Sequence, residues 1–174
     1  MATQSSIDRT KIGIILMDYQ IRGLSRFPAE FQKEILRKAN EVLAKARSER
    51  IPVIYVEVVR GERTPEIAIH PDIIPKQSEI VLTKHRVGPF STTNLDEVLK
   101  KQNIETLVIM GIQTGNSILS AVCWAADIGY KLIVISDCCA DQDVEVHRFL
   151  IERVLPRKAS VITSQEFLRV IERA

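Results

Sequence analysis

The sequence has no apolar run that approaches the roughly 20 residues needed to cross a bilayer. Residues 1–10 are polar and lack the layout of a signal peptide. Cysteine is scarce: three of 174 residues, two of them adjacent at Cys138 and Cys139, so no disulfide framework is expected. We therefore expect reduced thiols, a cytoplasmic location and no membrane partner.

A strong charge of one sign is also absent. The chain has 24 basic and 22 acidic residues, a formal net charge of +2. No basic run with interleaved aromatics is present, so we expect no nucleic-acid partner. Hydrophobic residues make up 45% and charged residues 26%, which is typical of a globular protein. The length suits one domain, which we place at residues 11–174 after a flexible N-terminal leader, 1–10.

Short apolar runs alternate with segments of helical spacing along the chain. The runs indicate strands buried on both faces, at 11–17, 52–58, 79–83, 106–111, 131–136 and 160–162. The helical patterns cover 28–49, 94–101, 115–128, 144–155 and 164–173. Residues 59–77, with three prolines, predict a long loop over a site. Together these predict a three-layer α-β-α fold of the Rossmann-like kind. Its sheet is mainly parallel, with about six strands and helices on both faces.

Polar side chains follow three of the predicted strands. Asp18 comes after the first strand, Lys84 after the third, and Ser117 opens the helix after the fourth. Each alone has a plain structural explanation: a turn cap, a solvated charge and a satisfied hydroxyl. Because ligands bind beyond the carboxyl ends of parallel strands, we expect the three to converge on one cleft. The glycine-containing turn 111–117 also feeds a helix N-terminus, which suits an anion or an oxyanion, although such turns are common without a ligand.

Motifs over nearly the whole chain resemble those of the isochorismatase-like superfamily, also called the cysteine hydrolases. They are Ile14-Ile15-Leu16-Met17-Asp18-Tyr19-Gln20, Lys84-His85-Arg86, Gly111-Ile112-Gln113-Thr114, Ala125-Ala126-Asp127 and Ser136-Asp137-Cys138-Cys139-Ala140-Asp141. The stretch 141–147, with 154–157 and 161–163, resembles a divergent branch whose members typically lack the nucleophilic cysteine.

The resemblance implies a catalytic set of Asp18, Lys84 and Ser117, with Ser117 at the position of the family's cysteine. It implies a non-proline cis peptide at Ile112–Gln113, of a kind that is tolerated mainly at functional sites. It also implies an oxyanion hole made by the backbone amides of Gln113 and Ser117. For the substrate pocket, our candidates are Gln20, Arg60, Arg86, Phe90, Thr114 and Asn116, with Arg60, Arg63 and Arg86 as candidate carboxylate clamps.

We expect no metal and no cofactor. The nicotinamidase branch has an Asp-x-His and a further His after its second strand, whereas this chain offers only His70 there. A zinc site needs three or four ligands. We expect His85 and His147 to be structural or exposed and Cys123 to be a packed thiol. The family commonly forms dimers or tetramers, which implies a homodimer or homotetramer that acts on a small molecule.

Three functions remain open from the sequence. In the first, Asp18 is a general acid that Lys84 orients, as in isochorismatases, which also lack the cysteine and cleave a vinyl ether. In the second, Ser117 is the nucleophile of an amidase or esterase, with Asp18 as its base. In the third, the protein has lost catalysis and binds a small molecule or a partner.

Overall fold

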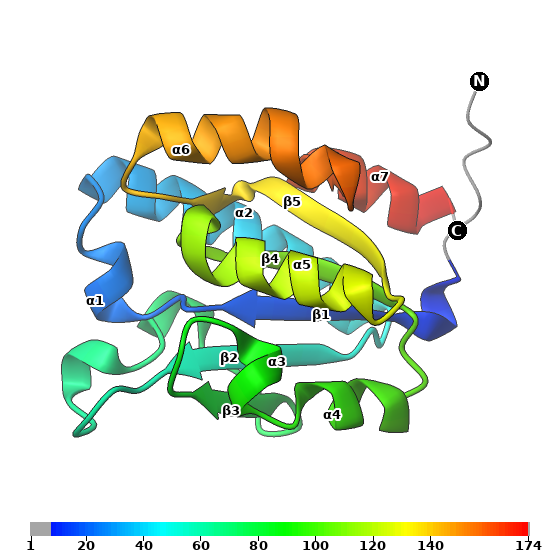
Figure 1. Cartoon of the computed structure of the whole chain (residues 1–174), viewed down its shortest axis with the longest axis horizontal. Coiled ribbons are helices and arrows are strands. Elements are labelled where there is room, and N and C mark those ends of the chain that lie inside the picture. Colours follow the sequence, from blue (N-terminus) through cyan, green and yellow to red (C-terminus); the bar gives the residue numbers. More distant parts are fainter. Residues whose placement is uncertain (1–7, 174) are drawn as a thin grey trace.

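The computed structural model describes residues 8–173 and contains a six-stranded sheet (Figure 1). Its strands are β1 (Ile12–Met17), β2 (Val53–Val58), β3 (Ile80–Lys84), β4 (Thr106–Ile112), β5 (Lys131–Ala140) and β6 (Ser160–Ile162). All neighbours pair in parallel, in the order β3-β2-β1-β4-β5-β6. The strand order reverses between β1 and β4, where open α/β sheets bind their ligands.

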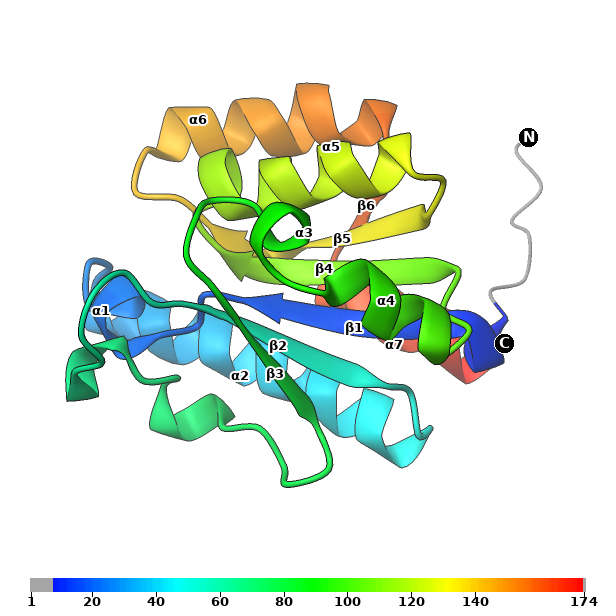
Figure 2. The ribbon, with the colours of Figure 1, turned by 60° about the horizontal axis from the view of Figure 1, so that its bottom comes forward.

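Helices cover both faces of the sheet, so the predicted three-layer fold is confirmed (Figure 2). They are α1 (Ile21–Leu24), α2 (Ala29–Ser48), α3 (Pro89–Thr92), α4 (Leu95–Lys101), α5 (Leu119–Asp127), α6 (Val144–Phe149) and α7 (Ser164–Arg173). α2 and α7 lie on one face, and α3, α4 and α5 lie on the other. Within residues 8–173, no helix is long and apolar enough to cross a membrane.

The two central strands hold the middle of the core. Every residue of β1 is buried, as is β4 from Leu107 onward, which explains why both read as continuous apolar runs. Their carboxyl ends approach closely at Gly111, where an added Cβ would lie 2.4 Å from the Met17 carbonyl oxygen. The absence of a side chain at Gly111 therefore lets the residues that follow β1 and β4 meet.

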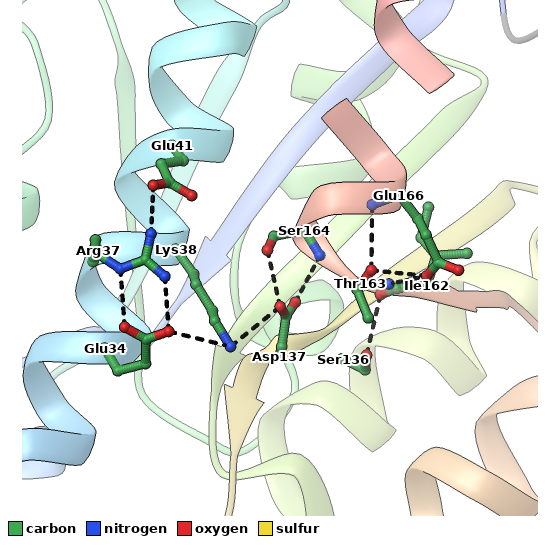
Figure 3. A network of polar contacts seen from close by, with 10 residues as sticks. All are labelled: Glu34, Arg37, Lys38, Glu41, Ser136, Asp137, Ile162, Thr163, Ser164 and Glu166. Atoms are coloured by element: carbon green, nitrogen blue, oxygen red, sulfur yellow. Dashed lines mark hydrogen bonds and ion pairs between the residues drawn. The ribbon is translucent and has the colours of Figure 1, made fainter. Parts of the chain in front are cut away.

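β5 extends four residues beyond the predicted 131–136, because Asp137 interrupts the apolar run without ending the strand. Asp137 accepts hydrogen bonds from the backbone amide (2.7 Å) and hydroxyl (2.9 Å) of Ser164, and Lys38 of α2 lies 3.4 Å away (Figure 3). The Thr163 amide donates to the Glu166 carboxylate, and the Glu166 amide donates to the Thr163 hydroxyl. This reciprocal pair of hydrogen bonds caps α7. Asp137 is thus a structural member of its motif, joining β5 to both helices of one layer.

The predicted helix ends need small corrections. Pro28 precedes α2 as its N-cap instead of lying in its first turn. The helical pattern at 115–128 begins as a π-helical turn, Thr114–Ile118, and α6 continues as another, Leu150–Val154. Residues 1–7 of the predicted leader lie outside the described residues. The prediction is wrong for its last part, because Arg9–Lys11 form a 3-10 turn and Arg9 pairs with Glu49 at 3.1 Å.

Candidate active site

Three strands deliver Asp18, Lys84 and Ser117 to one point at the carboxyl edge of the sheet. Lys84 Nζ lies 2.7 Å from Asp18 Oδ2 and 2.6 Å from Ser117 Oγ. The Ser117 hydroxyl in turn donates to Asp18 Oδ2. The predicted convergence of these three side chains is confirmed, and they form a closed ring of charge-assisted hydrogen bonds.

The Lys84 ammonium is fully used. Its third contact is the Val87 carbonyl oxygen, 2.8 Å away, so its three protons have three acceptors. The Lys84 side chain is 1% exposed and the Asp18 side chain 11%. Within residues 8–173, Asp18 Oδ1 is the one buried side-chain oxygen or nitrogen without a hydrogen-bond partner. One carboxylate oxygen is therefore held by the ring, and the other is buried without a hydrogen-bond partner.

The backbone is unusual at the site. Asp18 and Gln113, the residues that follow β1 and β4, both have positive φ, 59° and 69°. Left-handed backbone is uncommon for residues other than glycine, although aspartate tolerates it better than most. Such conformations gather where a side chain must be aimed at a site. Here the positive φ angles of Asp18 and Gln113 turn the chain sharply just after β1 and β4, the two strands between which the strand order reverses.

Burial controls the protonation of the pair. Burial raises the pKa of the Asp18 carboxyl, against the opposing effects of Lys84, Ser117 and Arg60. Burial also lowers the pKa of the Lys84 ammonium, Asp18 raises it, and Arg60 lowers it further. The carboxyl therefore holds a proton more readily than an exposed aspartate does, as a proton-transfer group requires.

Two predictions about the turn after β4 are wrong in this structure. The described residues contain no cis peptide, so Ile112–Gln113 is trans, and the turn is made by the positive φ of Gln113. The Gln113 amide donates to the Ala140 carbonyl oxygen at 2.7 Å, so it is not free to hold an oxyanion. The long β5 provides that acceptor. An oxyanion role for the Ser117 amide stays a prediction.

Two of the pocket candidates serve the protein itself. Gln20 donates to the Val58 and Ile67 carbonyl oxygens and accepts from the Val58 amide, so its side chain anchors the long loop to β2. Thr114 is fully buried, and its hydroxyl lies 2.8 Å from His147 Nδ1. The polar groups of Gln20 and Thr114 thus already have partners within the chain.

Sequence reasoning missed how α6 and the segment between β5 and α6 hold the Ser117 turn. His147 binds Thr114, and the Gly115 amide donates to Asp141 Oδ2 at 2.7 Å. Burial lowers the pKa of the His147 imidazole, although Asp141 opposes this. A signal was present in the sequence, since Asp141 and His147 both lie in motifs of the family. Their partners, however, lie 26 and 33 residues away.

The other pocket candidates differ in how closely they approach the site. Arg60 is exposed, and Val59, directly before it, donates to the Lys84 carbonyl oxygen at 3.0 Å. Arg63 pairs with the buried Glu57, so the prediction that it clamps a substrate carboxylate is wrong. Exposed Arg86 and Asn116 and buried Phe90 stay candidates; Asn116 bonds Gln113 Oε1 at 2.9 Å.

The histidines and cysteines have local roles. His70 Nδ1 accepts from the Asp72 amide at 3.2 Å, and His85 Nδ1 lies 2.9 Å from the Val59 carbonyl oxygen. Residues 8–173 contain no cluster of three or more histidine, cysteine, aspartate or glutamate side chains that could hold a metal ion. Burial raises the pKa of both adjacent thiols, that of Cys139 to about 12, so neither is a reactive thiolate.

Comparison with known proteins places this doubly wound α/β fold in a family. The model of the isochorismatase domain matches residues 13–166. The isochorismatase family protein YecD of Escherichia coli O157:H7 is 27% identical over 157 residues, which cover 79% of this chain and 84% of YecD. The isochorismatase of Bacillus subtilis is 29% identical over 103 residues, 59% of this chain but only 33% of that enzyme.

A solved cysteine hydrolase from Pseudomonas syringae pv. phaseolicola has the same fold, with a TM-score of 0.88 and 99% of each chain covered at 21% identity. The chain therefore belongs to the isochorismatase family. This membership makes it a hydrolase and leaves its substrate open.

Proposed function

We propose that this hydrolase cleaves a small molecule by proton transfer from Asp18, in a reaction of the vinyl-ether type. The observation that carries this proposal is the buried Asp18 Oδ1, which has no hydrogen-bond partner while Oδ2 is held by Lys84 and Ser117. A carboxyl with a raised pKa and one oxygen that no protein group binds is suited to general-acid catalysis.

In this reaction Asp18 protonates the carbon end of the vinyl ether and leaves an oxocarbenium ion on the other carbon. Water adds to that ion, and its proton returns to Asp18. The resulting hemiketal divides into a carbonyl compound and an alcohol. Lys84 keeps the Asp18 side chain in place and offsets the negative charge of the carboxylate after the proton has left. Ser117 acts here only as a hydrogen-bond partner.

An anionic substrate is favoured by Arg60. Burial has the largest effect on the pKa of the Asp18 carboxyl, and Lys84 opposes it. The positive charge of Arg60 also lowers this pKa, so the guanidinium is within electrostatic reach of the site. Arg60 is exposed, and the residue before it, Val59, donates its backbone amide to the Lys84 carbonyl oxygen. A guanidinium in this position suits a substrate carboxylate. The name of the Bacillus subtilis relative makes isochorismate the first substrate to test.

A second candidate is an amidase or esterase with Ser117 as nucleophile. It is favoured by the hydrogen bond from the Ser117 hydroxyl to Asp18, because a nucleophile must give its proton to a nearby base. Lys84 would stabilise the serine oxygen as it loses that proton. This candidate ranks second because a serine hydroxyl is far less acidic than the thiol that this family's site otherwise carries.

The experiment is a turnover panel of vinyl ethers, primary amides and esters, including isochorismate, with product identification by mass spectrometry. We expect cleavage of a vinyl ether that carries a carboxylate. Cleavage of an amide or ester alone would favour the serine mechanism. Binding without turnover of any class would contradict both and favour a protein that only binds its ligand.

The cytoplasmic location and the homodimer or homotetramer are further parts of this proposal. The cytoplasmic location is supported by three free cysteines. The oligomeric state is supported by resemblance to the family. Fractionation of the source cells tests the location.

A further inference from the structure

The π-helical turn Thr114–Ile118 is held from outside by residues that the proposed function leaves unused. A π-helical turn is a rare form of helix that is frequent at functional sites. The hydroxyl of its first residue, Thr114, lies 2.8 Å from His147 Nδ1 of α6. The amide of its second residue, Gly115, donates to Asp141 Oδ2 at 2.7 Å. Two successive residues of the turn are therefore bonded to the segment that follows β5.

Asp141 also joins this turn to the start of α6. Its Oδ1 atom accepts from the Asp143 amide at 3.2 Å, and Asp143 is the N-cap of α6. An added Cβ at Gly115 would lie only 3.1 Å from Val146 Cγ1, so the turn and α6 are packed closely against each other. A displacement of α6 would therefore displace the turn.

The contact between Thr114 and His147 is the most shielded of these contacts. The Thr114 side chain is fully buried, and within residues 8–173 His147 is the one partner of its hydroxyl. A buried hydroxyl that loses its partner is costly, so the two groups resist separation. Ser117, three residues further along the same turn, is also buried.

We propose that His147 is a positioning residue for the active site. Through Thr114 it keeps the Ser117 hydroxyl in hydrogen-bond contact with Asp18. Ser117 Oγ has two partners at the site, Asp18 Oδ2 and Lys84 Nζ, the latter at 2.6 Å. Both bonds depend on the turn staying where α6 holds it. This inference rests on the proposed function, because it takes Asp18 as the reacting group.

The expected consequence is a change in the protonation of Asp18. Burial raises the pKa of the Asp18 carboxyl, and the groups that face it, Lys84, Ser117 and Arg60, lower it. Loss of the Ser117 hydrogen bond removes one of these lowering effects, so the pKa of Asp18 should rise further. If His147 served only to stabilise the fold, its replacement would leave this pKa unchanged.

Titration of the Asp18 carboxyl carbon by NMR tests this without any substrate. Ser117→Ala provides the reference, since it removes the hydroxyl outright and should raise the pKa of Asp18. Thr114→Val and His147→Phe break the supporting contact from its two sides. Each should raise the pKa of Asp18 toward its value in Ser117→Ala. Thr114→Val leaves the charges of His147 and Asp141 in place, so a shift in this variant cannot come from either charge.

A conservative variant and a distant one serve as controls. His147→Asn should keep the pKa of Asp18 near its wild-type value, because the asparagine amide can still bond to Thr114. Ser136→Ala removes a hydroxyl that bonds to the Ile162 carbonyl oxygen at 3.2 Å, a contact that joins β5 to β6. This variant should leave the pKa of Asp18 unchanged. Thermal melts establish that each variant is folded.

An unchanged pKa of Asp18 in both Thr114→Val and His147→Phe would overturn the proposal. So would an unchanged pKa in Ser117→Ala, because the hydroxyl would then have no effect on Asp18. In double variants with Ser117→Ala, neither change should shift the pKa further, and full addition of the shifts would show that His147 does not act through Ser117. Failure of the proposed function would appear instead as the absence of vinyl-ether cleavage, on which this titration does not depend.

Discussion

Lys84 Nζ and Asp18 Oδ2 form an ion pair of 2.7 Å that is almost completely removed from water. Taking two such charges out of solvent is costly, and their attraction offsets that cost only while both are present. The pair therefore does more to fix the position of Asp18 than to stabilise the fold.

Lys84→Met should strongly destabilise the protein, because it leaves Asp18 buried without its cation. Breaking a buried pair on one side costs about 3–5 kcal/mol, which urea unfolding at pH 7 measures. Lys100→Met is the control: Lys100 lies 2.6 Å from Asp96, but its side chain is 70% exposed, so its loss should change the free energy of unfolding little. Equal effects of the two variants would show that burial of the Lys84 pair has no special cost.

Arg60→Gln should shift the pH dependence of turnover. Arg60 contributes a positive charge that favours ionised Asp18, so its removal raises the pKa of the Asp18 carboxyl. An acid with a higher pKa keeps its proton to higher pH. The alkaline limb of the pH profile of kcat/KM should therefore move to higher pH. KM for an anionic substrate should rise about tenfold in parallel. Arg60→Lys should keep the alkaline limb at its wild-type pH and restore only part of the substrate affinity. An alkaline limb that does not move in Arg60→Gln would exclude Arg60 from the site.

The stability of the wild-type chain should decrease on acidification below pH 6.5 in part because of His147. Burial lowers the folded-state pKa of this imidazole below its unfolded value of about 6.5. In the window between the two values the unfolded chain binds more protons, so the free energy of unfolding rises with pH there and falls as acid is added. Urea unfolding between pH 5 and 8 should show a shallower slope for His147→Asn than for the wild type. An identical slope would mean that His147 does not titrate differently on folding.

Gly111→Ala should prevent the close approach of β1 and β4. Its methyl group would lie 2.4 Å from the Met17 carbonyl oxygen and 2.9 Å from Met17 Cβ, both within a packed strand pair. We expect a loss of about 3 kcal/mol or more by thermal and urea unfolding. Gly23→Ala provides the comparison, since its nearest atom outside the local helix is 3.4 Å away. A stable Gly111→Ala variant would show that the strands can separate at the site.

The convergence of Asp18, Lys84 and Ser117 was predictable because parallel strands bring their carboxyl ends to one edge. The strands themselves were recognisable, since burial on both faces makes each a continuous apolar run. The chain order of polar residues after those runs was enough to predict that these three side chains meet.

The conformation of the turn after β4 was not predictable in the same way. The Gln113 amide is held by Ala140, which lies in the part of β5 beyond the polar Asp137. A local apolar pattern ends at such a residue, although the strand continues, so both the extension and its contact were missed. The same holds for Thr114 and His147, whose hydrogen bond joins two segments that carry no local sign of each other.

The most direct test of Asp18 as the proton donor compares Asp18→Asn with Ser117→Ala on the vinyl ether that the wild type cleaves. An amide keeps the shape of the Asp18 side chain but cannot give the proton. We expect Asp18→Asn to reduce kcat about 10²- to 10⁴-fold and Ser117→Ala to stay within about tenfold of the wild type, with both variants folded. Loss of turnover in Ser117→Ala, or near-normal turnover in Asp18→Asn, would contradict the mechanism.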